Sequence, residues 1–121
     1  MLKRIIAAST LAILTSCCHS AESKLVGSWQ WKSCDDAGDV AYRADHTFTS
    51  REWAVTYTHQ PPVVMDGGEW HIRRGRLVMD FKGNARVVQA RHAELPLTFF
   101  DSDTFIVRTT DGRFNTFERL K

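Results

Sequence analysis

Along most of the chain, apolar and polar side chains alternate with the period of two that is typical of half-buried β-strands. The segment Lys24 to Lys32 shows the pattern first, because Leu25, Gly27, Trp29 and Trp31 fall on one face. Comparable stretches follow up to the C-terminus, and no helical stripe of useful length interrupts them. The pattern therefore predicts an all-β domain.

Turn signals at regular spacing divide this region into about eight short strands. We expect tight turns at Ala44-Asp45-His46, Arg74-Gly75, Lys82-Gly83-Asn84, Asp101-Ser102-Asp103 and Asp111-Gly112, and longer loops at Ser33–Asp39 and Thr58–Gly68. A long strand-like run from Ala85 to Leu95 is expected to end before Pro96, since proline cannot donate to a ladder. Short strands joined by tight turns favour an antiparallel up-and-down meander, either a barrel or a sandwich.

The first sixteen residues differ from the rest of the chain. Lys3 and Arg4 precede a short apolar run from Ile5 to Leu14. A membrane-spanning helix needs about 20 apolar residues, so this run is too short to span a bilayer. It has the size of the apolar region of a secretory signal peptide, which we expect at residues 1–16.

The residues that end this leader are Leu14-Thr15-Ser16-Cys17, an aliphatic residue and two small ones before a cysteine. They resemble the lipobox of bacterial lipoproteins. The resemblance implies that the Cys17 thiol receives a diacylglyceryl group, that the chain is cut before Cys17, and that the new amino group is acylated. The alternative is an ordinary cut near Ala21, which would place His19 where a small residue is preferred.

Three parts follow from this interpretation: a signal peptide at 1–16, a lipidated tether at 17–23 and a globular domain at 24–121. Several acyl chains make a stable membrane anchor, whereas one chain binds only marginally. We therefore expect the domain to be held at a bacterial membrane through Cys17, facing the periplasm. In an enterobacterium-like host, the resemblance to its lipoproteins implies sorting to the outer membrane.

Two further cysteines, Cys18 and Cys34, remain after Cys17 is acylated. The periplasm is oxidising, so the pair could form a disulfide that closes a loop of about 15 residues and adds about 3 kcal/mol of stability. The alternative is two free thiols, because Cys18 belongs to a segment of small polar residues.

Charge argues against a nucleic-acid partner. The chain has 16 Lys and Arg against 14 Asp and Glu, and without Lys3 and Arg4 the two numbers are equal. Proteins that bind nucleic acid need a basic face. Four Trp and seven Phe in so short a chain indicate a core built on aromatic rings.

Three segments resemble small bacterial lipocalin-like lipoproteins. They are the Gly-x-Trp opening Leu25-Val26-Gly27-Ser28-Trp29, its recurrence in Gly68-Glu69-Trp70-His71-Ile72, and the final Asp111-Gly112 with Phe117-Glu118-Arg119. The resemblance implies an eight-stranded up-and-down barrel in which Trp29 closes the bottom and Arg119 lies across its ring. Gly27 would let the backbone pass close beneath this Trp. The chain is much shorter than full-size lipocalins and shows no C-terminal helix pattern.

Motifs of catalysis are missing from the sequence. It has no Gly-x-Ser-x-Gly elbow, no glycine-rich phosphate loop and no His-Glu-x-x-His. We expect neither an enzyme nor a cofactor. No metal site is expected either, because no ligand spacing connects the histidines His19, His46, His59, His71 and His92, and the aspartates Asp35, Asp36 and Asp39 are typical of a solvated turn.

An eight-stranded barrel is either filled by side chains or holds one small ligand. The residues expected to point inward are Trp31, Tyr42, Phe48, Trp53, Trp70, Leu77, Met79, Phe105 and Phe114. They would form either a solid core or the pocket of a small apolar or amphipathic ligand. The arginines expected on solvated outer faces are Arg43, Arg51, Arg73, Arg74, Arg76 and Arg91.

A second hypothesis is an interaction or inhibitor lipoprotein of the immunity type, with a filled core and an envelope protein as its partner. Its contact surfaces would be the loops Ser33–Asp39 and Thr58–Gly68. The stretch from Pro61 to Met65 is apolar for a loop, which is typical either of a binding patch or of a loop folded over the barrel.

Overall fold

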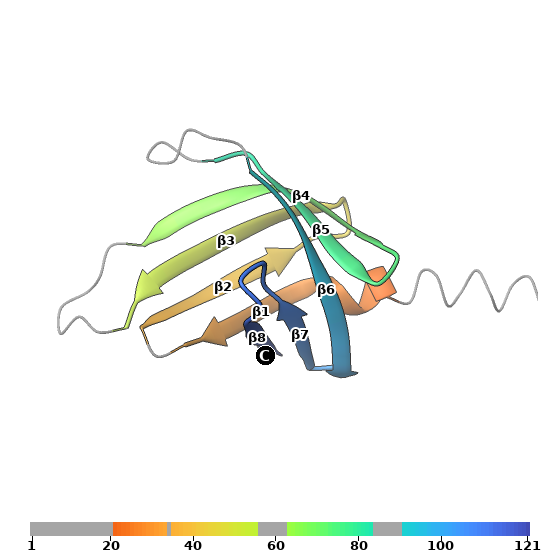
Figure 1. Cartoon of the computed structure of the whole chain (residues 1–121). Helices are drawn as coiled ribbons and strands as arrows, with labels where there is room; N and C mark the ends of the chain where they lie inside the picture. Colours follow the sequence, from red (N-terminus) through yellow and green to blue (C-terminus); the bar gives the residue numbers. More distant parts are fainter. Residues whose placement is uncertain (1–20, 34, 56–62, 84–90) are drawn as a thin grey trace, which may run out of the picture.

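A computed structural model describes residues 21–33, 35–55, 63–83 and 91–121, which fold into a closed antiparallel β-barrel (Figure 1). Each strand pairs with the next along the chain, and the last pairs with the first. The all-β class and the up-and-down meander are therefore confirmed, with a barrel and not a sandwich. The strands are β1 (Gly27–Lys32), β2 (Asp36–Tyr42), β3 (Thr47–Ala54), β4 (Val64–Arg73), β5 (Arg76–Phe81), β6 (Arg91–Asp101), β7 (Thr104–Arg108) and β8 (Phe114–Arg119).

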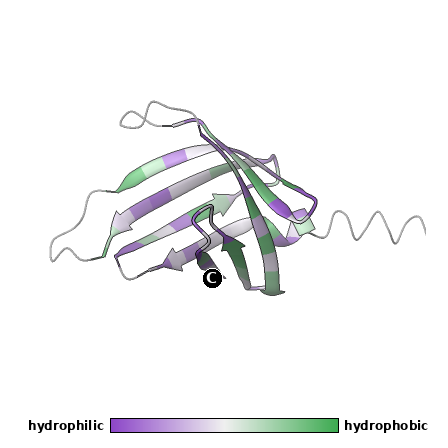
Figure 2. Cartoon of the chain, viewed as in Figure 1, coloured by the Kyte–Doolittle hydropathy of each residue, from purple (hydrophilic) through white to green (hydrophobic). Residues whose placement is uncertain are grey.

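The period-two pattern builds the interior of this barrel. Apolar and polar residues alternate along the strands (Figure 2), and alternate side chains of one strand point to opposite faces. The buried core consists of Leu25, Trp29, Val40, Tyr42, Phe48, Trp70, Leu77, Met79, Phe105 and Val107.

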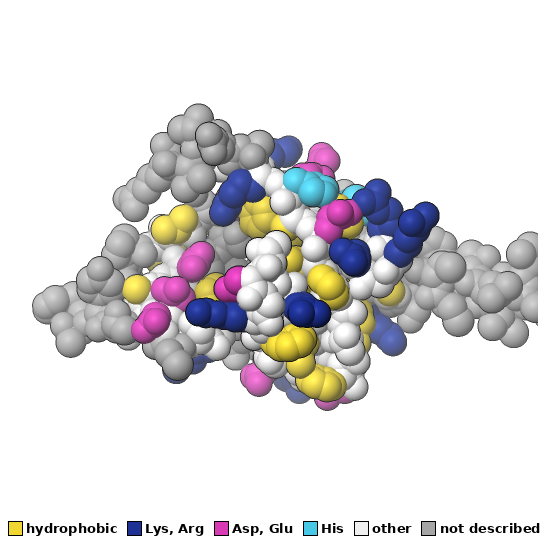
Figure 3. All heavy atoms as spheres, in the orientation of Figure 1, with side chains coloured by type: hydrophobic (Ala, Val, Ile, Leu, Met, Phe, Trp, Pro, Cys, Tyr) yellow, Lys and Arg dark blue, Asp and Glu magenta, His cyan; other side chains and the backbone are white. Residues whose placement is uncertain are grey.

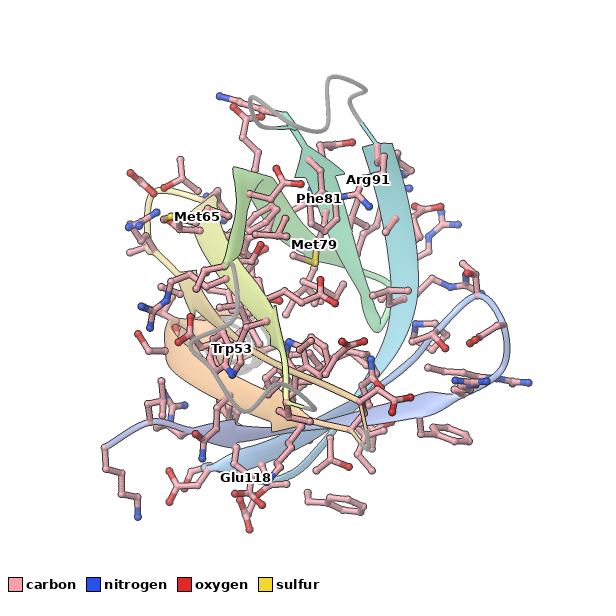
Figure 4. All side chains as sticks on the ribbon, turned by 90° about the vertical axis from the view of Figure 1, so that its left-hand side faces the viewer. Trp53, Met65, Met79, Phe81, Arg91 and Glu118 are labelled. Carbon is pink, nitrogen blue, oxygen red and sulfur yellow. The ribbon has the colours of Figure 1, made fainter. Side chains whose placement is uncertain are left out.

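The two ends of the barrel differ in how they are closed. One end, called the base, holds the helical residues 21–25 and the tight turns that follow β2, β4 and β6. The opposite end, called the mouth, holds the first residues of β2, β4, β6 and β8, and Figure 4 looks into it. The predicted signal peptide, Cys17, Cys18, Cys34 and residues 58–62 of an expected loop lie outside the described residues.

The domain begins earlier than expected. Residues 21–23, expected in the tether, belong to the helical turn at the base. The Glu22 carboxylate lies 2.6 Å from Nε2 of His46, in the turn between β2 and β3. This contact joins the start of the chain's described part to the barrel.

Two expected loops are partly strand. β2 begins at Asp36 inside the predicted loop Ser33–Asp39, and β4 begins at Val64 inside the predicted loop Thr58–Gly68. Asp39 faces outward, opposite Arg51 on β3, whose guanidinium donates to it at 2.9 Å. An ion pair across the strands makes a turn-type residue compatible with a strand.

β6 does not end at Pro96 but continues to Asp101. Pro96 is the last residue that pairs with β5, and Leu97 is the first that pairs with β7. Proline has no N–H to donate, and Pro96 lies where β6 changes from one neighbouring strand to the other. A missing ladder hydrogen bond is tolerated at such a position.

Candidate ligand cavity

The base of the barrel is filled by aromatic side chains. Trp29 is fully buried, and its Nε1 donates to the carbonyl oxygen of Leu25 at 2.8 Å. Its ring meets the ring of Phe105 edge-on, with centroids 4.6 Å apart. The ring of Phe117 stacks parallel to that of Phe105, with centroids 4.7 Å apart. These contacts leave the base solid.

Arg119 seals the base from outside. Its guanidinium carbon lies 4.2 Å from the centroid of the Trp29 ring, the contact that the lipocalin-like resemblance implies. The guanidinium also donates to the carbonyl oxygens of Lys24 at 2.7 Å and Val26 at 3.1 Å. Gly27 makes room for this group, because a Cβ there would lie 2.5 Å from Nη1 of Arg119. The space that we expected beneath Trp29 is thus used by the arginine.

A cavity of about 200 Å³ occupies the half of the barrel nearer the mouth. Its deep wall is apolar and includes Tyr42, Leu77, Met79 and Phe117. Met79 lies in the interior in the view through the mouth (Figure 4). The Tyr42 hydroxyl donates to Sδ of Met79 at 3.7 Å, and burial raises the pKa of this hydroxyl, which therefore remains neutral.

One side of the cavity near the mouth combines an indole with a carboxylate. Trp31, Gly38 and Glu52 lie side by side on β1, β2 and β3. A Cβ at Gly38 would lie 2.6 Å from Nε1 of Trp31, so the indole covers the position where a side chain is missing. The ring of Trp31 therefore extends across β2 towards β3, and both Trp31 and Glu52 line the cavity.

The Glu52 carboxyl group has a raised pKa. Partial burial contributes most, the nearby negative charge of Asp36 adds to it, and the positive charge of Arg91 acts against it. Among the described residues, Glu52 has no ion-pair partner. Its side chain is exposed at the mouth, so solvent and not a protein cation surrounds the carboxylate.

The opposite side of the mouth carries an ion pair between Arg91 and Asp66. Arg91 lies over the ring of Phe81, with its guanidinium carbon 4.9 Å from the centroid, and donates to the carboxylate of Asp66 at 2.9 Å. Figure 4 shows Arg91 beside Phe81 at the mouth. The expectation that Arg91 belongs to a solvated outer face is wrong: it lies on the inward-facing row of β6, because Phe81, its partner on β5, lines the cavity.

The residues expected to point inward fall into three groups. Trp31, Tyr42, Leu77 and Met79 line the cavity, whereas Phe48, Trp70 and Phe105 are buried in the solid core. Two lie elsewhere. Trp53 lines a depression of about 530 Å³ on the outer face with Lys32 and Glu118, and Phe114 is 67% exposed on the outward row of β8.

Both differences have the same physical cause. A shift of one residue along a strand moves a side chain to the other face of the sheet. On β3 the inward row runs through Phe48, Ser50 and Glu52, so Trp53 points outward. Sequence reasoning missed Ser50 and Glu52 because it followed the aromatic residues of this run, although strict alternation from Phe48 would have identified both.

The outer surface is polar and mixed in charge. Ion pairs join neighbouring strands, as in Arg51–Asp39 and Arg73–Glu94, and Figure 3 shows basic and acidic side chains interspersed over one face. Exposed pairs of this kind add little stability, about 0–1 kcal/mol each. They keep the outside of the barrel solvated and leave the mouth as the opening to the interior.

Neither a metal centre nor a membrane-crossing helix is found in the part of the chain that the structure describes. Within it, no three His, Cys, Asp or Glu side chains gather closely enough to hold a metal ion. Within the same ranges, no helix combines the length and the apolar character that crossing a bilayer requires. The sequence matches no protein-family model, and it matches no curated protein at a significant level.

Proposed function

We propose that this protein is a lipocalin-like binding module that holds one small amphipathic ligand in its barrel. The observation that carries the proposal is the cavity of about 200 Å³, which has an apolar deep wall and a polar mouth. Small-molecule sites combine mostly apolar walls with a few polar groups that fix the ligand's orientation. The apolar part of the ligand would lie against Tyr42, Met79 and Phe117, and its polar part would lie beside Glu52 at the mouth.

The size of the cavity limits the ligand. An apolar cavity of about 150 Å³ accommodates benzene, and sites for drug-sized ligands begin at about 300 Å³. A volume of about 200 Å³ is therefore suited to a single ring system with a short substituent. A complete long-chain fatty acid would not fit, because the rings of Trp29 and Phe105 fill the base.

Calorimetry with indole, a neutral probe of suitable size, tests this function. We expect the unmodified barrel to bind indole, and Ser50→Phe to abolish binding because the new ring fills the cavity from β3. Thr98→Phe is the matched control, since Thr98 is exposed on the outer face of β6. Native mass spectrometry of the protein from its own host adds a second readout. No bound molecule there, together with no indole binding, would refute the proposal.

We also propose that Cys17 anchors the barrel to a bacterial envelope membrane, facing the periplasm and in an enterobacterium-like host at the outer membrane. The leader and Leu14-Thr15-Ser16-Cys17 support this. Ala21 follows Cys17 by four residues, which span at most about 14 Å. Since the helical residues 21–25 belong to the base, an acylated Cys17 would keep the base near the membrane and leave the mouth open to the periplasm.

Mass spectrometry of the mature protein tests the anchor. We expect an N-terminal Cys17 that carries fatty acyl groups, and recovery of the protein with membranes. Cys17→Ala should prevent acylation and release the domain from the membrane fraction, whereas Cys34→Ala should leave it there. A mature protein that begins near Ala21 and carries no fatty acid would contradict the anchor without affecting the cavity.

A second candidate function is binding of an envelope protein at the mouth. The observation in its favour is a run of apolar side chains at the start of β4, where Val63, Val64 and Met65 are 45%, 39% and 52% exposed. Large exposed apolar patches mark sites of protein contact. A partner bound by the native protein and lost with Val64→Ser, but retained by Thr98→Ser, would support this function, and equal binding to both variants would exclude the start of β4.

A further inference from the structure

We propose that the ligand of this cavity is a small organic cation, an aromatic or aliphatic amine whose ammonium group lies between the Trp31 indole and the Glu52 carboxylate. This inference rests on the proposed function and names the chemical class of its ligand. It follows from the shape of one wall and from the balance of charge at the mouth.

The wall formed by β1, β2 and β3 offers two groups that bind ammonium. The Trp31 ring covers Gly38, and Glu52 lies opposite Gly38 on the next strand. An ammonium ion gains about 0.5–2 kcal/mol over the face of an indole, and its N–H groups form strong hydrogen bonds with a carboxylate. Both groups line the same cavity, so one cation can contact them together.

The other charges near the mouth favour a cation over an anion. Among the described strand residues of the inward-facing rows, the mouth carries the carboxylates of Asp36, Glu52 and Asp66 and the guanidinium of Arg91. Arg91 is already bound by Asp66 and lies over Phe81, so its charge is largely satisfied. An anionic ligand would have to compete with Asp66 for Arg91, and it would face Glu52 and Asp36.

The deep wall is suited to the apolar part of an amine ligand. This wall presents the apolar surfaces of Tyr42, Leu77, Met79 and Phe117. The neutral hydroxyl of Tyr42 already donates a hydrogen bond to Sδ of Met79. Besides Glu52, the described lining includes one ionised residue, Arg51, whose guanidinium is bound by Asp39 on the outer row of β2. The ligand would therefore carry its charge at one end, and a body of about one ring would fill the volume below it.

Calorimetry with three probes of similar shape tests the inference: phenylethylamine, phenylethanol and phenylpropionate. We expect the amine to bind about 10-fold tighter than the alcohol or more, since a charge-assisted bond replaces a neutral contact, and the carboxylate to bind most weakly. Glu52→Gln should remove most of this preference, so that phenylethylamine and phenylethanol bind with similar affinity. Glu69→Gln, on the exposed outer row of β4, should change neither affinity.

The outcomes separate the inference from the function on which it rests. If phenylethanol or indole binds but the amine binds no tighter, the ligand is not a cation and the binding function stands. If no probe binds and indole fails as well, both fail. If Glu52→Gln does not fold, Trp31→Leu replaces it, and we expect the ratio of amine to alcohol affinity to fall by about 2–10-fold. An amine preference that survives in the folded variant would overturn the inference.

Discussion

The base and the mouth of the barrel are built from the same kinds of side chain but satisfy them differently. At the base, the indole Nε1 of Trp29 and the guanidinium of Arg119 are bonded to carbonyl oxygens of the same chain. At the mouth, the Trp31 indole covers Gly38 of β2, which has no side chain. The Glu52 carboxylate has no hydrogen-bond or ion-pair partner among the described residues. Each end places a charged group near an indole, but only at the base do the indole N–H and the charged group both have hydrogen-bond partners within the described chain.

This difference separates stability from binding. Polar groups that are all bonded within the chain fix one structure, whereas an uncompensated charge beside an open volume is available to a ligand. In the described part of the chain, every buried side-chain nitrogen or oxygen has a hydrogen-bond partner. The unpaired carboxylate of Glu52 is exposed at the mouth, where solvent or a ligand can reach it.

The largest effect should come from removing the centre of the base. Trp29→Ala deletes a fully buried indole with its hydrogen bond and its contacts to Phe105 and Arg119. We expect a loss of about 3–5 kcal/mol in the free energy of unfolding, measured by urea titration. Trp53→Ala, which removes a half-buried indole from the outer surface, should cost much less. Similar losses would mean that the base is not the stabilising end.

A smaller effect is expected from Gly27→Ala. Gly27 has φ of 137°, and an added Cβ would meet Nη1 of Arg119 at 2.5 Å. We expect a loss of about 1–3 kcal/mol in the free energy of unfolding, from backbone strain and displacement of the guanidinium. Gly112→Ala is the matched control, because Gly112 also has a positive φ but nothing lies within 4 Å of its added Cβ.

A double-mutant cycle tells whether the Arg119 guanidinium is what requires a glycine at position 27. The double variant Gly27→Ala/Arg119→Ala should be more stable than the sum of the two single losses predicts, since the clash disappears with the arginine. Additive losses would show that only the backbone conformation requires glycine at this position.

At the mouth, we expect a substitution to increase the stability of the fold and not to decrease it. Glu52 has a raised pKa in the folded protein, so its ionised form is disfavoured by folding at neutral pH. Glu52→Gln removes the charge. Because the side chain is exposed and solvent screens its charge, we expect the melting temperature to rise only by about 1–3 °C, while amine binding falls. A variant that loses both stability and binding would indicate that Glu52 supports the fold. Glu69→Gln serves as the outer-surface control for the thermal scan.

The sequence allowed the fold to be predicted better than the site. Alternation in segments such as Lys24 to Lys32, together with the turns at Arg74-Gly75 and Asp111-Gly112, is a local property, and it was enough for the strands and their meander order. Strand limits near Asp39 and Pro96 were wrong because an ion pair across strands and a change of strand partner are not visible in local sequence.

The cavity required information that one strand does not hold. Trp31, Gly38 and Glu52 come from three strands, and only the register brings them into one row. The absence of a side chain at Gly38 gives the indole its position, and a glycine in a strand has several possible meanings. Arg91 was assigned to the outer surface for the same reason, since its partner Asp66 lies 25 residues earlier in the chain.

The smallest predicted effect concerns the contact that joins the helical residues 21–25 to the base. The hydrogen bond from His46 lowers the pKa of the Glu22 carboxyl below its ordinary value of 4.5. A carboxyl whose folded-state pKa is depressed contributes stability above its unfolded pKa and loses it as the pH falls through the folded-state value. The stabilising contribution of Glu22 should therefore be complete at pH 6 (about 1.5 units above the unfolded pKa) and be lost in acid, as the pH falls through the lowered folded-state value.

Glu22→Gln isolates this contribution from the other carboxyl groups. Because the pair is largely exposed, we expect the variant to lose only about 0.3–0.5 kcal/mol in the free energy of unfolding near pH 6, and to match the unmodified protein in acid. Urea titrations at several pH values measure both. Amine affinity should not change, because Glu22 lies at the base and the cavity opens at the mouth. A variant that differed equally at all pH values would show that Glu22 acts through packing and not through its charge.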